Sequence, residues 1–313
     1  MNLIIQRLGQ SVITVFAALT VVFLVLRLTP GDPVQIMLGE YATPELTATL
    51  RKQYGLDQSL PVQYIVFLKN TVTGNFGQSL SQKTSVTSVV QGALPYTVIL
   101  AVAAMIVTCL VGIPLGIIAA LKRNTLADFA SMVIALTGIA MPGFLLALLL
   151  IYVLSYKFGW FPVQGAGEGA GIGSSLHHLI LPAVALGFQS AALVARTTRS
   201  ALLGVLGEDY IRTARAKGLS PQSVLWGHSL RSALVPILAV LGLYFGQLLG
   251  GAGVVEIVFG RPGLGKLLIG AILARDYPLS QALIAVFLVG VIAVNFFTDT
   301  LYGFADPRLR RSS

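Results

Sequence analysis

The chain has 313 residues, of which 55% are hydrophobic and only 11% charged, and its formal net charge is +9. Soluble domains carry about a quarter charged residues, so this composition excludes an ordinary soluble protein and indicates an integral membrane protein. The positive charge is typical of cytoplasmic loops of membrane proteins and does not indicate nucleic-acid binding. The single cysteine, Cys109, excludes a disulfide framework and a cysteine-based metal cluster.

Residues 8–26 form the first predicted membrane span. Its apolar core is too long for a signal peptide, and no small-residue cleavage site follows it. We therefore expect residues 1–29 to be an uncleaved anchor. Residues 30–95 are polar and long enough for a small subdomain outside the membrane. Within it, proline and acidic residues predict helices over 45–54 and 61–73.

The remaining core, residues 96–303, is predicted to hold five more spans. They cover residues 97–121, 129–156, 179–195, 233–258 and 279–301. A break is expected in the third span, where Met141, Pro142 and Gly143 interrupt the apolar run. A glycine-rich loop over 165–173 leads to the fourth span. Residues 259–278 are too short and too interrupted to cross, and a short helix is expected over 264–273.

Six spans place both termini on the same side of the membrane. Lysine and arginine concentrate on cytoplasmic loops, and one set of loops is enriched in them. Its members are Arg7, Lys122, Arg123, Arg196, Arg199, Arg212, Arg215, Lys217, Arg231, Arg308, Arg310 and Arg311. We therefore expect an all-α integral membrane protein with six transmembrane helices, a cytoplasmic N-terminus, a cytoplasmic tail over 304–313, and residues 30–95 outside.

Two spans carry glycines at the spacing of helix–helix contacts. Gly112 and Gly116 flank a proline kink expected at Pro114 in the second span. In the fifth span, glycines recur every four residues. These are Gly242, Gly246 and Gly250. Small residues on one helix face let a neighbouring helix approach closely, so the pattern predicts tight packing within or between subunits. A wider lumen beside the fifth span is the alternative.

Four polar side chains within the predicted spans are candidates for a pathway. Glu256 is near the outer end of the fifth span, and the amides of Gln189, Gln247 and Asn295 are deeper. Polar groups within the membrane are costly and mark candidate pathways, although an interhelical hydrogen bond is an alternative role for a buried amide. No span carries the series of central acids or histidines that a proton relay requires.

The sequence gives no support for chemistry performed by this chain. Residues 260–266 match the first seven positions of a phosphate-binding P-loop, but Leu267 replaces the required Ser or Thr, and the stretch follows a span. His177 and His178 are adjacent and lack the spacing of metal ligands. No nucleophile–base arrangement or paired carboxylates occur. We expect no catalytic residue, no metal and no cofactor in this chain.

The longest polar stretch of the chain lies between the fourth and fifth predicted spans. Acids at its start and bases at its end predict a helix over 208–217, and Gly218 is typical of a helix stop. Ser220 and Pro221 are typical of the start of a second short helix. We interpret residues 208–227, named the elbow below, as a surface that docks on a partner protein.

The elbow resembles the EAA loop of ABC-transporter permease subunits. Thr213, Ala214 and Gly218 fit its pattern, and Leu230 matches farther on. Arg212, His228 and Arg231 depart from it where the pattern has Glu, Ile and Pro. The string from Asp209 to Gly218 has the form this loop takes in the dipeptide, oligopeptide and nickel branch of binding-protein-dependent importers. Other stretches resembling that branch are 26–33, 54–58, 62–64, 74–77, 262–266, 275–278 and 306–310.

The resemblance implies a type I ABC-importer permease fold in the bacterial inner membrane. The long region after the first span resembles the first permease of the pair. The implied partners are a homologous second permease, two ATPase subunits that bind ATP and magnesium, and a periplasmic binding protein, with membrane lipid around the spans. The implied ATPase-coupling residues are Glu208, Asp209, Tyr210, Arg212, Thr213, Ala214, Arg215, Ala216, Lys217 and Gly218.

The resemblance implies di- or oligopeptides as substrates, and nickel chelates and glutathione remain open within the same family. Two other classes stay as alternatives. A self-contained secondary transporter needs a coupling-ion site or an inverted repeat, and neither is recognisable. A membrane-embedded enzyme is disfavoured because the sequence lacks a catalytic constellation.

Overall fold

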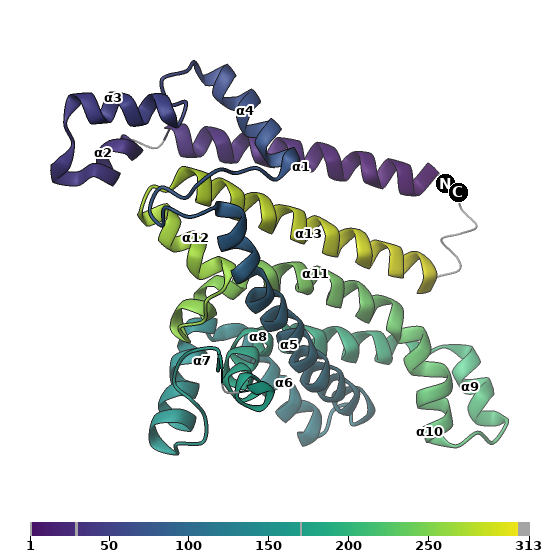
Figure 1. Ribbon diagram of the computed structural model, residues 1–313. Coiled ribbons are helices and arrows are strands. Elements are labelled where there is room, and N and C mark those ends of the chain that lie inside the picture. The colour runs from purple at the N-terminus through teal and green to yellow at the C-terminus, as the bar shows by residue number, and fades with distance from the viewer. Residues whose placement is uncertain (1, 29–30, 170, 306–313) are drawn as a thin grey trace. The chain divides into compact units, whose positions relative to one another are not determined.

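The structure, a computed structural model, describes residues 2–28, 31–169 and 171–305. These residues are almost entirely helical (Figure 1), and the only β-pairing among them is an isolated antiparallel bridge between Gln78 and Ser85. Four helices are long and apolar enough to cross a membrane, or five if one sharply bent pair counts as a span. The first predicted span falls in α1 (Asn2–Leu28), whose shorter apolar stretch is Gly9–Val25. The six-span topology therefore stays a prediction.

The chain divides into two compact units. The first comprises Met1–Thr97 and Pro262–Ile292, and the second comprises Val98–Arg261 and Ala293–Ser313. Two long helices, α5 (Val86–Leu121) and α13 (Tyr277–Ala305), each contribute residues to both units.

The first unit begins with α1 and three shorter helices that follow it. These are α2 (Pro33–Leu38), α3 (Pro44–Gln53) and α4 (Leu60–Thr73). Local capping explains where two of them start. The Asp32 side chain accepts a hydrogen bond from Val34 N (3.0 Å), and Thr43 Oγ1 accepts one from Leu46 N (3.3 Å). In both helices proline occupies the first turn, where its missing N–H costs nothing.

Two apolar clusters hold the first unit together. In one, α4 packs through Tyr64 and Phe67 against Leu19 and Phe23 of α1 and Ala285 of α13. In the other, the start of α5 packs against α12 (Leu264–Leu273) and α13. Its buried members are Val86, Val90, Ala93, Leu264, Ala271, Leu279, Ala282 and Leu283. Burial of these side chains fixes α4 and the start of α5 onto the other helices of the first unit.

Asp276 joins two distant parts of the first unit. Its carboxylate is fully buried and caps α13 by accepting from Leu279 N (3.2 Å). It also accepts from Ser81 N (3.0 Å), Ser81 Oγ (2.8 Å) and Ser79 Oγ. A buried carboxylate is tolerated when hydrogen bonds replace its hydration, so this single side chain ties the segment before α5 to the start of α13.

The second unit contains the bent helix pair. Helix α6 (Leu126–Ala140) ends at Met141, whose backbone is extended, and α7 (Gly143–Leu150) starts after Pro142. A π-helical stretch, Ile151–Lys157, continues α7. The two arms differ in direction by 106°. Pro142 cannot continue α6 because its ring disfavours a helical backbone at Met141, so the predicted break is confirmed, and it is a sharp turn.

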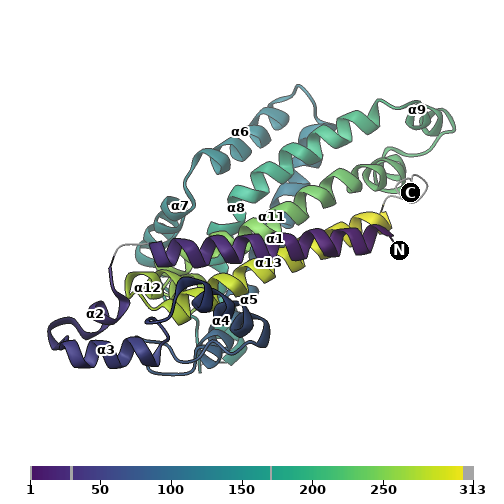
Figure 2. The same cartoon turned by 90° about the horizontal axis from the view of Figure 1, so that it is seen from above.

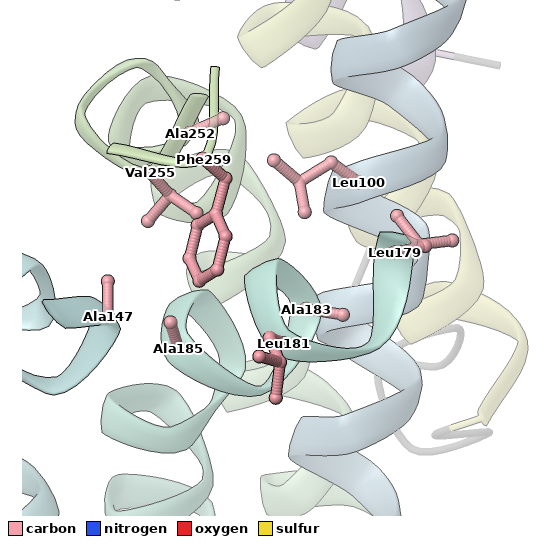
Figure 3. Close-up of a cluster of buried hydrophobic side chains, with 9 residues drawn as sticks. All are labelled: Leu100, Ala147, Leu179, Leu181, Ala183, Ala185, Ala252, Val255 and Phe259. Carbon is pink, nitrogen blue, oxygen red and sulfur yellow. The ribbon is translucent and has the colours of Figure 1, made fainter. Parts of the chain in front are cut away.

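Helix α8 (Gly171–Leu206) is the centre of the second unit and packs against α6, α7 and α11 (Leu230–Val258), as the second view also shows (Figure 2). In Figure 3, the ring of Phe259, at the end of α11, points toward Ala185 of α8. The other members of this buried cluster are Leu100, Ala147, Leu179, Leu181, Ala183, Ala252 and Val255. The small residues of α8 let its neighbours approach closely.

The helices expected over 45–54, 61–73 and 264–273 are confirmed as α3, α4 and α12. Three helices extend beyond the membrane spans predicted within them, and one of these helices overlaps the predicted glycine-rich loop. Helix α5 begins at Val86 instead of near 97; α8 begins at Gly171, so the predicted loop is partly helix; and the fifth predicted span continues a helix that begins at Pro221. In each case, the polar end of a helix projects beyond its apolar part. The expected tail from Asp306 onward lies outside the described residues.

Candidate functional site

The elbow consists of α9 (Asp209–Ala216), a short turn and the start of a long helix (Figure 1). Its turn has the Schellman geometry. Gly218 N donates to Arg215 O (2.9 Å) and Leu219 N donates to Ala214 O (3.4 Å), while Gly218 has φ +80°. A left-handed residue after a helix is strongly favoured to be glycine. The predicted stop at Gly218 is confirmed.

One face of α9 anchors it to the second unit. Ile211 is fully buried and Ala214 is 8% exposed, and both pack against Val224, with Val205 at the edge of the cluster. Residues three apart lie on the same helix face. Ala214, which the sequence placed among the coupling residues, therefore lies on the buried face of α9 in this structure.

The opposite face of α9 is polar and exposed. Its exposed members are Glu208, Asp209, Tyr210, Arg212, Thr213, Arg215, Ala216, Lys217 and Gly218. Arg212 and Asp209 form a 3.4 Å ion pair one turn apart, but both side chains are highly exposed, so the pair adds little stability. Tyr210 OH donates to Ser232 Oγ (2.9 Å) and links α9 to α11. Helix α9 is thus packed against the second unit on one face and exposes charged side chains on the other.

The second half of the elbow is continuous with a span. Ser220 Oγ accepts from Ser223 N (3.2 Å), and Pro221 occupies the first turn of α10 (Pro221–Ser223). A π-helical stretch over Val224–Ser229 then joins α10 to α11 without a break. The expected separate second helix is therefore the first turns of one helix that runs from Pro221 to Val258.

The elbow's second half is also packed onto the neighbouring helices. Leu225 is 8% exposed and lies in a cluster with Ala120 of α5, Leu202 of α8, and Ala233 and Ile237 of α11. Displacement of α9 therefore acts directly on α11 through the turn, and on α8 and α5 through packed side chains.

An ion pair that the sequence did not reveal connects the first turn of α6 to α8. Arg199 donates from Nε and Nη2 to the two carboxylate oxygens of Asp128, each at 2.8 Å, and Asn124 N donates to Asp128 Oδ2 at 3.0 Å. The planar guanidinium matches the carboxylate in this paired arrangement. Asp128 and Arg199 are 71 positions apart, so no local pattern could have paired them.

The glycines of α5 lie against the backbone of α8. A Cβ atom added to Gly112 would lie 2.6 Å from Ala191 O, and one added to Gly116 would lie 2.5 Å from Ala195 O. On α11, Gly242 lies against Thr298 of α13 and Gly246 is buried, whereas Gly250 is exposed with open space around it. Of the predicted stripe on α11, Gly242 and Gly246 are therefore buried and Gly250 is not.

The four polar pathway candidates differ in exposure. Glu256 is fully buried, whereas Gln189, Gln247 and Asn295 are exposed on helices α8, α11 and α13. Gln247 shares an exposed face of α11 with residues at helical spacing. These are Leu243, Gly250 and Val254. This face is exposed in the described part of the chain and carries one amide among small and apolar side chains.

The two histidines and the stretch that resembles a P-loop make contacts within the fold. His177 and His178 lie in α8, where a ring nitrogen of each is 2.8 Å from a carbonyl oxygen, that of Trp160 and Ser174 respectively. The stretch over 260–266 leads into α12, where Leu264 N donates to Thr97 Oγ1 (2.8 Å). The described residues contain no group of three or more His, Cys, Asp or Glu side chains that could hold a metal ion.

Comparison with known proteins identifies the family of this chain. Residues 112–311 match the family model for the binding-protein-dependent transport system inner membrane component, and residues 1–101 match the N-terminal model of the same system. The chain is 42% identical to the di/tripeptide transport system permease protein DppB of Pseudomonas aeruginosa and 41% identical to the glutathione transport system permease protein GsiC of Escherichia coli K12. Each match covers 99% of both chains.

The fold has solved counterparts at low sequence identity. The chain superposes on the MetNI methionine ABC transporter in an inward-facing conformation with a TM-score of 0.59 and 17% identity, over 70% of this chain and 96% of that one. An all-helical chain with several apolar spans, matched by family models over most of its length, is a multi-pass transport component of the inner membrane and not a catalytic subunit. It belongs to the family of binding-protein-dependent ABC importer permeases, in the branch that includes the peptide and glutathione permeases.

Proposed function

We propose that this chain forms half of the translocation pathway of an ATP-driven importer for di- or oligopeptides. The elbow couples it to a cytoplasmic ATPase, a homologous second permease forms the other half, and a periplasmic binding protein delivers the substrate. ATP and magnesium are bound by the two ATPase subunits. The observation that carries the proposal is the two-sided α9: Ile211 and Ala214 anchor one face, and the opposite face is charged and exposed.

This function requires the elbow to be in the cytoplasm. The Lys and Arg distribution supports that orientation, with the N-terminus on the same side and residues 30–95 outside. Six spans, with α1 as the first, complete the arrangement.

Closure of the ATPase dimer on ATP would bring the elbows of the two permeases together. A short, hydrogen-bonded turn joins α9 to the helix that starts at Pro221 and continues as α11. Because Leu225 of that helix packs onto α5 and α8, the force reaches three helices. The spans then pivot as packed bodies, and the pathway opens alternately to either side. Gln189, Gln247 and Asn295 are our candidates for that pathway or for the surface of the second permease, because exposed amides are costly against lipid.

Co-purification tests the docking role. Arg215→Glu and Lys217→Glu reverse charges on the exposed face and should lower the amount of ATPase recovered with the chain. Lys157→Glu is the control, because this exposed lysine ends the π-helical stretch after α7 and should not lie near the ATPase. Recovery of ATPase equal to wild type from both elbow variants would contradict the proposal.

Uptake measurements distinguish the candidate substrates. Di- and tripeptides are our first choice, and glutathione, itself a tripeptide, is the second because permeases for both are about equally similar to this chain. Nickel chelates are a third option. Cells with the complete importer should accumulate a labelled dipeptide, and unlabelled peptides should compete with it. Competition by glutathione but not by ordinary peptides would favour the second candidate.

A further inference from the structure

A cavity in the first unit lies beside an arginine at the end of α1. Its volume is about 450 Å³, within the range of small-ligand sites. Three segments far apart in sequence supply most of its walls: the end of α1, the segment from Lys52 through α4, and the start of α13. The lining residues used below are Arg27, Lys52, Val62, Val66, Tyr277 and Gln281.

Arg27 is a cation without an anion among the described residues. Its guanidinium carbon lies 5.5 Å from the ring centroid of Phe23 and 5.2 Å from that of Tyr277, so two aromatic rings hold it in place. Two acids of this unit are engaged elsewhere: Asp32 pairs with Arg51, and Asp276 accepts from two serines. A partly buried charge near the end of a span is costly unless an opposite charge accompanies it.

Two buried donors at the cavity have no acceptor in the described part of the chain, and one lining acceptor, Gln63 Oε1, has no donor there. Gln281 is only 9% exposed, and its Nε2 finds no hydrogen-bond partner in the described part of the chain. The Nε of Arg27 is buried and likewise without a partner there. Lys52 adds a second cation to the wall. Buried donors are normally satisfied, so this set points to an oxyanion.

Helix α4 supplies an apolar surface next to these donors. Val62 and Val66 line the cavity and are 43% and 48% exposed, and Ile65 on the same helix is 65% exposed. The opposite face of α4 packs against Leu19 and Phe23 of α1. These residues precede Arg27 by eight and four positions, or roughly 12 and 6 Å along the helix. If Arg27 lies at headgroup level, α4 extends into the depth of the acyl chains.

We propose that this cavity binds a phospholipid, with the headgroup phosphate on Arg27 and an acyl chain along Val62 and Val66 of α4. A phosphate supplies the oxyanion that Arg27, Gln281 and Lys52 lack, and arginine recognises it with paired hydrogen bonds. The exposed apolar side chains of α4 are then covered by lipid instead of water. The site ties the extramembrane segment to the membrane and does not depend on which substrate the importer carries.

Native mass spectrometry of the complete transporter tests the site. The complex is reconstituted in nanodiscs of phosphatidylethanolamine and phosphatidylglycerol, extracted in mild detergent and washed. Wild type should retain bound phospholipid, and Arg27→Gln should weaken retention by roughly tenfold to a hundredfold, the worth of a charged hydrogen-bonded contact. Lys69→Gln is the matched control, because Lys69 is exposed on α4 and does not line the cavity. Equal retention by Arg27→Gln and wild type would overturn the proposal.

A second variant identifies the occupant even if Arg27→Gln does not assemble. A photo-crosslinking amino acid at Val66 should acquire the mass of a phospholipid. A cross-link to the second permease or to the binding protein would show that protein covers α4, and would contradict the lipid site. Thermal stabilisation by inorganic phosphate equal to that by phosphatidylglycerol would identify a free anion as the ligand, and would also contradict it.

Discussion

Gly218 gives the sharpest test of the elbow's geometry. The residue has φ +80°, and an added Cβ would have no described atom within 4 Å. A substitution therefore meets no steric obstacle from neighbours, and its cost comes from the left-handed backbone alone. That cost is about 1–2 kcal/mol for an ordinary L-residue and is larger for a β-branched one, whereas Asn tolerates the conformation.

Gly218→Val should therefore destabilise the Schellman turn and loosen the link between α9 and α11. A cost of at least about 1–2 kcal/mol lowers the population of the intact elbow relative to the opened one by roughly 5- to 30-fold or more. Uptake driven by ATP should fall, while the amount of chain in the membrane stays near that of wild type, because the turn is exposed and outside the packed core.

The assay compares labelled-peptide uptake, ATPase activity of the purified complex and membrane level for wild type, Gly218→Val and Gly218→Asn. Gly218→Asn should retain most of the uptake. Uptake by Gly218→Val equal to wild type would refute the reasoning. An equally severe loss in both variants would also refute it, because Asn tolerates the left-handed backbone conformation and Val does not.

Three further outcomes follow from contacts in the two units. Gly116→Ala places a Cβ 2.5 Å from Ala195 O and should destabilise the α5–α8 contact by about 1–3 kcal/mol, measured as a lower melting temperature, whereas Gly250→Ala should be tolerated. Asp276→Ala removes the acceptor for Ser79 and Ser81 and should increase proteolysis between α4 and α5, whereas Asp276→Asn should retain part of the protection. Asp128→Asn leaves Arg199 without its carboxylate and should lower the melting temperature, and the charge swap Asp128→Arg with Arg199→Asp should recover part of the loss.

Local signals in the sequence were sufficient to predict where the short helices begin and end. Helix α12 was predicted over the residues it occupies, and α3 and α4 lie within one residue of their predicted starts. Pro44 and Pro61 fall in first turns, and Gly74 ends α4 in the left-handed conformation. These signals act over a few residues, and tertiary contacts do not override them here.

The ends of the long helices could not be predicted from hydropathy. Hydropathy marks the edge of the apolar layer, whereas a helix continues for as long as its backbone bonds and packing allow. Helix α8 starts at Gly171 despite glycines at 171 and 173, and α11 continues a helix that begins at Pro221. Packing against neighbouring helices outweighs the low helix propensity of these residues.

Within the candidate site, the elbow's boundaries and turn were predictable, but its buried face was not. The alternation of charges indicates a helix, yet only the positions of Val205 and Val224 show that Ile211 and Ala214 face inward. The Asp128–Arg199 pair and the Arg27 cavity join segments far apart in the chain, and no spacing in the sequence encodes such contacts.

The central claim, that the exposed face of α9 docks on the ATPase, is tested most directly by cross-linking in the assembled importer. A photo-crosslinking amino acid is placed at Arg212, whose side chain is 74% exposed, and in a control at Leu273 on α12, which is 78% exposed. The account predicts an ATPase cross-link from position 212, changed in yield by ATP, and none from position 273. An intact, transporting complex without an ATPase cross-link at 212 would contradict it.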